Sequence, residues 1–257
     1  LCSSRLPWPT MPSAAEHVQR LFRRIGRSGL LIIAGVIMLL VVRELPIESS
    51  LAQVREGGAL TVCVPPSLPP LLTPRSGSDQ YQGSEAELVR SITAEIDVSV
   101  QWNPQPGWGD TIDPSDWGMR PSACQLVVGG IAASEETRTL MELVPYRTAE
   151  WSIAGDPGAG PTGLYLPFWG IDRGQAARWI RDQGYEQRYL FGAKAARDAL
   201  QGGKVSAILS LRPVARWLAG DRQVRPVQGL SAETLVLATW KGRTTINREV
   251  RRIVPSP

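Results

Sequence analysis

The reactive side chains of this sequence set the first limit on its chemistry. Its only histidine, His17, precedes a long apolar run, so the chain after that run holds no Ser-His-Asp triad, no Cys-His pair and no histidine-based metal site. Lysine, tyrosine and carboxylate chemistry survive this exclusion, but no nucleophile stands in a recognisable pattern with a base. We therefore predict that the protein is not an enzyme and has no catalytic residue, no metal site and no cofactor.

Positive charge is concentrated at the start of the chain. Residues 1–52 carry six arginines and three glutamates, whereas the remaining residues carry 22 basic and 21 acidic side chains. A net charge of +1 outside the first 52 residues leaves no basic stripe of the kind that nucleic acids require. We therefore expect no nucleic-acid partner.

An uncharged apolar run of 14 residues extends from Gly29 to Val42. As a helix it would span about 21 Å, which is less than the ~30 Å hydrocarbon core of a bilayer. The run fits either the core of a signal peptide that is cut after Ala52, or a short transmembrane anchor that is retained.

Four arginines directly before this run place residues 1–28 in the cytoplasm by the positive-inside rule. Residues 43–50 would connect the run to the exported part of the chain. We predict a location on the periplasmic side of the bacterial inner membrane, with the membrane as a partner through residues 29–42, or a soluble periplasmic protein if the leader is cut.

The rest of the chain alternates between expected strands and expected helices. The first set comprises strands at 60–64, 98–102 and 126–128, the last ending at Gly129-Gly130, and a helix from Ser84. The sequence Ser84-Glu-Ala-Glu87 is typical of a capping box. The second set comprises strands at 151–154, 189–191, 205–209 and 234–240, and helices at 173–183, 193–201, 214–219 and 245–253. This alternation predicts a parallel α/β sheet.

Several short motifs occur in the order that is found in a known family. A strand, Leu60-Thr-Val-Cys-Val64, runs into two prolines and is followed by Gly-x-x-x-Glu-Leu, Val-Val-Gly-Gly130 and Pro145-Tyr146. With the element at 199–207, residues 51–254 resemble the family 3 extracellular solute-binding proteins. The resemblance implies an α/β, two-lobed, periplasmic-binding-protein-like (type II) fold. Lobe 1 would comprise 51–147 and 233–257, and lobe 2 would comprise 148–232.

A narrower resemblance is to the binding proteins that accompany quinoprotein methanol dehydrogenases. That subgroup has a cysteine in its first strand and another that opens a later strand, as Cys63 and Cys124 do here. The resemblance places these two strands side by side and implies a disulfide in an oxidising compartment. Two buried free thiols are the alternative.

The residues with which the family holds amino acids are largely missing. Where amino-acid-binding members have two aspartates, this chain has Ser206 and Leu211, and a buried ammonium group without a carboxylate partner is costly. The aromatic residue that usually follows Pro-Pro is Leu71. Arg138 corresponds to the arginine that binds the ligand carboxylate, but it is equally placed to pair with neighbouring glutamates on a helix surface.

The resemblance still points to a set of ligand-facing positions. Pro70 and Leu71 would line the mouth of the cleft or form an ordinary loop. Gly129 and Gly130 would offer backbone N–H groups to a ligand or form a tight strand exit. The candidate ligand-binding residues are Pro70, Leu71, Gly129, Gly130, Arg138, Ser206 and Leu211. Four tryptophans fit either an aromatic pocket or, more commonly, a core: Trp108, Trp117, Trp151 and Trp169.

Two functions fit these observations. We favour an exported, membrane-tethered accessory or structural subunit of a membrane or periplasmic complex, because both aspartates are absent and the leader can serve as an anchor. The alternative is a periplasmic binding protein for a small, largely apolar or weakly polar solute that serves a transporter or sensor, with closure of the lobes around the solute.

Overall fold

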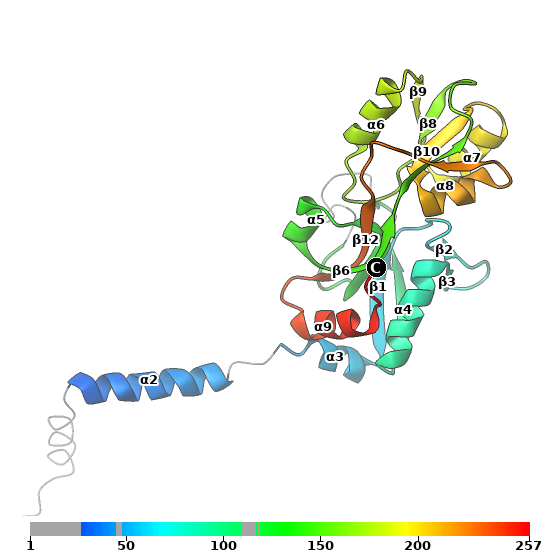
Figure 1. Ribbon diagram of the computed structural model, residues 1–257. Helices are drawn as coiled ribbons and strands as arrows, with labels where there is room; N and C mark the ends of the chain where they lie inside the picture. The colour runs from blue at the N-terminus through cyan, green and yellow to red at the C-terminus, as the bar shows by residue number, and fades with distance from the viewer. Residues whose placement is uncertain (1–26, 45–47, 109–116, 118) are drawn as a thin grey trace, which may run out of the picture. The chain divides into compact units, whose positions relative to one another are not determined.

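The computed structural model describes residues 27–44, 48–108, 117 and 119–257. The chain divides into two units, Leu1–Ile47 and Glu48–Pro257. In the first unit the apolar run forms helix α2 (Arg27–Glu44) (Figure 1). Among the helices that the structure describes, none is both long enough and apolar enough to cross a membrane. The anchor predicted at residues 29–42 stays a prediction. Residues 1–26 of the predicted cytoplasmic stretch lie outside the described residues.

One five-stranded sheet, with its helices, forms what we call lobe 1; its strands follow the order β4-β1-β5-β12-β6. Figure 1 labels β1, β12 and β6 of this sheet. The strands are β1 (Ala59–Val64), β4 (Ser99–Pro104), β5 (Leu126–Ala132), β6 (Met141–Ala149) and β12 (Glu233–Trp240). Strand β1 pairs in parallel with β4 and β5, whereas β12 runs antiparallel to both β5 and β6. The sheet is therefore mixed and not parallel as predicted, because its fourth strand returns from the other lobe.

The helices of lobe 1 are α3 (Ser50–Gly57), α4 (Ser84–Glu95), α5 (Glu135–Leu140) and α9 (Thr244–Ile253), and a small hairpin joins β2 (Thr73–Pro74) to β3 (Tyr81–Gln82). Helix α4 buries Val89 and Ile92 as the periodicity predicted. The predicted capping box is wrong, because Gly83 is the N-cap residue and no side chain caps the helix. Glu87 is exposed, and Glu85 is buried instead.

A second five-stranded sheet, with its helices, forms lobe 2, in the order β11-β7-β10-β8-β9. Its strands are β7 (Trp151–Gly155), β8 (Thr162–Leu164), β9 (Gln187–Tyr189), β10 (Ala207–Leu211) and β11 (Val224–Pro226), and its helices are α6 (Arg173–Asp182), α7 (Ala193–Gln201) and α8 (Arg212–Ala219). The chain enters lobe 2 between β6 and β7 and returns between β11 and β12. The lobe boundaries at residues 147/148 and 232/233 stay a prediction.

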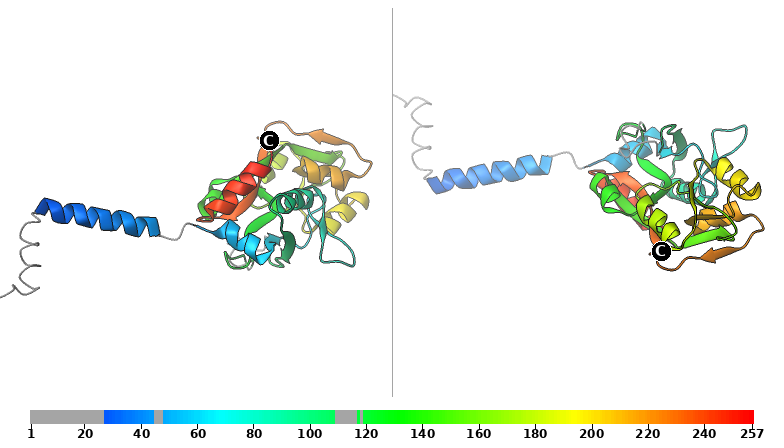
Figure 2. Two further views of the ribbon diagram at one scale, coloured as in Figure 1. Left: turned by 90° about the horizontal axis from the view of Figure 1, so that it is seen from below. Right: turned by 90° about the horizontal axis from the view of Figure 1, so that it is seen from above.

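The end of the predicted connector is part of the folded second unit. Helix α3 begins at Ser50 and lies beside α9 (Figure 2). The Glu48 carboxylate accepts hydrogen bonds from the N–H and the hydroxyl of Thr245, both at 2.7 Å, and Leu51 N–H donates to the same hydroxyl at 3.1 Å. Partial burial acts to raise the pKa of Glu48, but hydrogen bonds from Ser50 and Thr245 outweigh it and lower that pKa to about 2.

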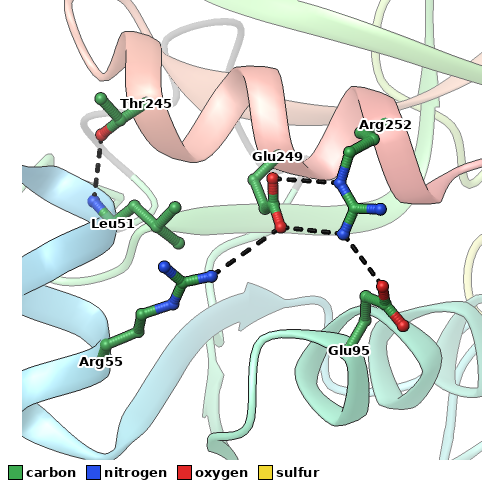
Figure 3. Close-up of polar contacts among 6 residues, drawn as sticks. All are labelled: Leu51, Arg55, Glu95, Thr245, Glu249 and Arg252. Atoms are coloured by element: carbon green, nitrogen blue, oxygen red, sulfur yellow. Dashed lines mark hydrogen bonds and ion pairs between the residues drawn. The ribbon is translucent and has the colours of Figure 1, made fainter.

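An exposed network of ion pairs joins three helices of lobe 1 (Figure 3). Arg252 of α9 lies 3.0 Å from both Glu249 of α9 and Glu95 of α4. Arg55 of α3 lies 3.9 Å from Glu249. Such exposed pairs are screened by water and add little to stability, so the network supports the packing of these helices without dominating it.

The predicted disulfide is confirmed: Cys63 and Cys124 are bonded, with Cα atoms 5.6 Å apart. Both cysteines are fully buried, Cys63 on β1 and Cys124 two residues before β5. They belong to a hydrophobic cluster that also contains Trp117 and Trp169. The disulfide therefore ties β1 to the chain just before β5 within this cluster.

Candidate functional site

A cavity of about 830 Å³ lies between the two lobes. Lobe 1 contributes Trp108, Trp117, Glu136 and the loop that follows β1. Lobe 2 contributes the segment between β8 and α6 and the residues that follow β9. The walls are mainly aromatic side chains, prolines and leucines. A second cavity, of about 600 Å³, lies between the Pro69-Pro70 loop and α7.

Residues 165–172, which we call the strap, join lobe 2 to lobe 1 by backbone hydrogen bonds. Trp169 N–H donates to the Gly130 carbonyl at 3.1 Å, and Ala132 N–H donates to the Trp169 carbonyl at 2.8 Å. Trp169 pairs in parallel with Ile131, whose other side faces β12. The strap therefore continues the sheet at the place where β1 has ended.

A side-chain hydrogen bond and a close backbone contact hold the strap tightly against lobe 1. The indole N–H of Trp169 donates to Glu136 Oε1 at 3.1 Å, and the Trp169 side chain is buried. Gly170, with φ +83°, approaches so closely that a Cβ there would lie 2.7 Å from the Ala132 carbonyl oxygen. Only glycine fits this position without displacing the strap.

A carboxyl group is buried directly beside Gly130. Glu85 is fully buried in the first turn of α4 and accepts hydrogen bonds from Gly130 N–H, at 3.1 and 3.3 Å, and from the Tyr146 hydroxyl. Burial raises the pKa of Glu85 to about 7, although these hydrogen bonds and the charge of Arg147 act to lower it. The N–H group that was predicted to meet a ligand at Gly130 is therefore already occupied, and its carbonyl is bonded to Trp169.

The other predicted ligand residues are dispersed. Leu71 and Leu211 are fully buried in the core, and the Ser206 hydroxyl donates to the Gly160 carbonyl at 3.0 Å. Arg138 is exposed on α5 and lines neither of the two cavities.

Two predicted residues lie close to a cavity. Pro70 is half-buried and lines the second cavity. Gly129 lies behind the wall of the first, because a Cβ there would come 2.2 Å from the Pro65 side chain and 3.2 Å from that of Trp108. The predicted set is therefore not gathered in one site.

Three of the four loop tryptophans form a continuous wall of the first cavity. Trp108 and Trp117 have ring centroids 5.5 Å apart, and Trp117 contacts Trp169 edge-on at 5.5 Å. Trp151 is buried in the core instead. The two alternatives predicted for the tryptophans, an aromatic pocket and a core, are therefore combined, because Trp117 and Trp169 are buried yet line the cavity.

The charged groups of the first cavity come from segments that the sequence did not single out. Glu136 and Asp172 supply carboxylates, and Arg173 supplies a guanidinium group. Asp172 caps α6 by accepting a hydrogen bond from Gln175 N–H at 3.0 Å and lies 3.5 Å from Arg178. The cavity therefore contains carboxylates although Ser206 and Leu211 replace the two family aspartates, because Glu136 and Asp172 come from other segments.

Metal binding has no support in the part of the chain that the structure describes. No three histidine, cysteine, aspartate or glutamate side chains there are grouped closely enough to hold a metal ion.

No protein-family model matches the sequence, and no curated protein matches it. Solved structures do match. An ancestral cationic amino acid solute-binding protein, AncCDT-1, is 20% identical with a TM-score of 0.66, over 80% of this chain and 92% of that one. The amino acid ABC transporter substrate-binding protein AbpA of Streptococcus pneumoniae, bound to L-arginine, is 17% identical with a TM-score of 0.59, over 79% and 90%.

A third similar structure is an ABC uptake transporter substrate-binding protein of Streptococcus pneumoniae with bound histidine. It is 15% identical with a TM-score of 0.61, over 79% of this chain and 87% of that one. These likenesses show that the chain has the two-lobed α/β fold of periplasmic binding proteins. At such identities they establish the fold alone.

Proposed function

We propose that this chain is a binding protein for a small, largely apolar or weakly polar solute, held in the first cavity. The single observation that carries the proposal is a cavity of about 830 Å³ between the lobes, walled mainly by aromatic and aliphatic side chains. Small-molecule sites usually occupy about 300–1,000 Å³ and have such walls with a few polar groups. Here Glu136, Asp172 and Arg173 are the charged groups among the described lining residues.

A free amino acid is not the expected solute, although two similar structures hold arginine and histidine. Leu211 is buried in the core, and both backbone polar groups of Gly130 are bonded within the protein. The carboxylate of an amino acid would therefore lack the Gly130 N–H group, and it would lie beside Glu136 and Asp172, which repel it.

Export to the periplasm remains part of this proposal, and the Cys63–Cys124 disulfide supports an oxidising compartment. The leader is proposed to act as a signal-peptide core. A cut after Ala52 would remove Glu48, Ser50 and Leu51, whose hydrogen bonds reach Thr245 on α9. We therefore expect the mature N-terminus at or before Glu48, which mass spectrometry of the exported protein would test.

An accessory subunit of a membrane or periplasmic complex is the second candidate function. The strap favours it, because backbone hydrogen bonds between Trp169 and lobe 1 tie the two lobes to each other, as suits a scaffold. The disulfide supports the narrower kinship with proteins that accompany quinoprotein methanol dehydrogenases.

Thermal unfolding with a panel of small solutes tests the two candidates. A solute at 100 times its Kd stabilises a folded protein by about 2.7 kcal/mol, so the binding protein should show a clear rise in Tm with some apolar or weakly polar compounds. An accessory subunit should show no rise with any compound and should co-purify with a larger complex from membranes. The second pattern would reject solute binding.

A further inference from the structure

Two aromatic side chains of lobe 2 are exposed at the first cavity. Phe191 is 79% exposed and Tyr189 is 54% exposed, and both line the cavity. Tyr189 ends β9, an edge strand, and Phe191 precedes α7. Large aromatic side chains gain by leaving water, so a ligand that covers these rings is stabilised by them.

The tryptophans on the lobe 1 side offer a fixed aromatic surface. Trp108 is half-buried and packs on Trp117, which packs on Trp169, with both centroid distances at 5.5 Å. Rings in such direct contact leave no gap for a cation between them, so they make a wall and not a cage. The hydrogen bond from Trp169 to Glu136 holds the end of this wall in place.

The charges beside these rings restrict the ligand further. Among the described residues that line the cavity, Glu136 and Asp172 against Arg173 carry a formal charge of −1. Carboxylate oxygens accept hydrogen bonds from N–H and O–H groups but repel another carboxylate.

From these observations we infer that the solute is a compound with a planar aromatic ring, neutral or cationic, whose ring is covered by Phe191 of lobe 2 and Trp108 of lobe 1. This inference rests on the proposed solute-binding function. Flat rings stack on aromatic side chains, whereas a puckered saturated ring of similar size gains only from burial. The inference therefore separates aromatic from aliphatic solutes of equal charge.

Isothermal titration of the full chain with four matched probes tests the inference. Phenethylamine and 2-phenylethanol carry a planar ring with a cationic or neutral group, 2-cyclohexylethylamine has a saturated ring, and phenylacetate carries a carboxylate. We expect both aromatic non-acids to bind at least tenfold more tightly than the other two.

Variants at Phe191 test which surface is responsible. Phe191→Ala should weaken phenethylamine binding about tenfold, and Phe191→Leu, which keeps apolar area without a ring, should weaken it about threefold. Leu140→Ala is the control, because Leu140 is 41% exposed on α5 and lines neither cavity. The affinity of the Leu140→Ala variant for phenethylamine should stay within twofold of that of the unsubstituted protein. Unchanged Tm values without probe would show that all three variants fold.

The outcomes separate this inference from the function on which it rests. If 2-cyclohexylethylamine binds as tightly as phenethylamine, or if Phe191→Ala has no effect, the aromatic inference is overturned while solute binding stands. If none of the four probes binds but other solutes raise the Tm, the same conclusion follows. If neither the probes nor the solute panel binds, both proposals fall.

Discussion

The buried carboxyl group of Glu85 leads to a specific prediction about pH. Its pKa lies at about 7 in the folded protein, against an ordinary value of 4.5, because the group is fully buried. This difference corresponds to about 3 kcal/mol at about 1.4 kcal/mol for each pKa unit. Since the folded protein holds this proton more tightly than the unfolded chain, the contribution to the free energy of unfolding is fully present below about pH 4.5. This contribution is lost as the pH rises through about 7. Above that, Glu85 no longer makes the free energy of unfolding depend on pH.

Glu85→Gln should remove this pH dependence. A glutamine keeps an oxygen for the Gly130 N–H and cannot become charged, so no cost of ionisation in the core remains. We expect the stability of the variant, relative to the unsubstituted protein, to improve by about 3 kcal/mol between pH 4 and pH 8. Urea unfolding followed by tryptophan fluorescence at several pH values measures this difference.

Glu87→Gln is the matched control, because it makes the same chemical change on an exposed position of the same helix. Its effect on the free energy of unfolding should stay within about 0.5 kcal/mol at every pH. The reasoning is refuted if the Glu85→Gln difference is the same at pH 4 and pH 8, or if the two variants behave alike.

Three further predictions concern other contacts. Replacing Cys63 and Cys124 together by alanine opens a link between residues 61 apart and should lower the free energy of unfolding by about 4 kcal/mol in urea; an unchanged value would contradict this. Gly170→Ala brings a Cβ 2.7 Å from a carbonyl oxygen and should cost about 2–4 kcal/mol. Gly184→Ala, at φ +76° in open space, should cost about 1–2 kcal/mol, and equal losses would show that the strap is not tightly packed. Glu48→Gln should cost about 1 kcal/mol at pH 7. With a pKa of about 2, Glu48 contributes stability above about pH 4.5 that is lost as the pH falls to about 2, so a pH-independent loss would refute the contact.

Much of the order of strands and helices could be predicted because the apolar pattern that encodes them is local, but strands β6 and β8 were missed. Helix α7 has the predicted bounds, 193–201, since Ala196 and Leu200 recur at helical spacing before two glycines. The direction of β12 could not be predicted in this way. Its place between β5 and β6 depends on where the chain returns from lobe 2, and no short pattern records that.

The candidate site was much less accessible from the sequence. The strap has no periodic pattern, and it pairs with β5, which lies more than thirty residues earlier in the chain. Glu85 was missed because an acidic residue in a first helical turn is normally read as a solvated one. A signal was present, since Glu85 precedes Val89 by four residues and therefore shares its buried face.

The pairing at the upper edge of the lobe 1 sheet has a mechanical consequence. Ala149 lies opposite Glu233, and Leu235 lies opposite Ala132, which bonds to the strap. The crossing from β6 to β7, the crossing from β11 to β12 and the strap therefore lie in a row across the neighbouring strands β6, β12 and β5. Three joints in a row permit bending about that row but resist twisting and sliding. We therefore expect the walls of the cavity to approach each other by a hinge rotation about a single axis, which runs along this row.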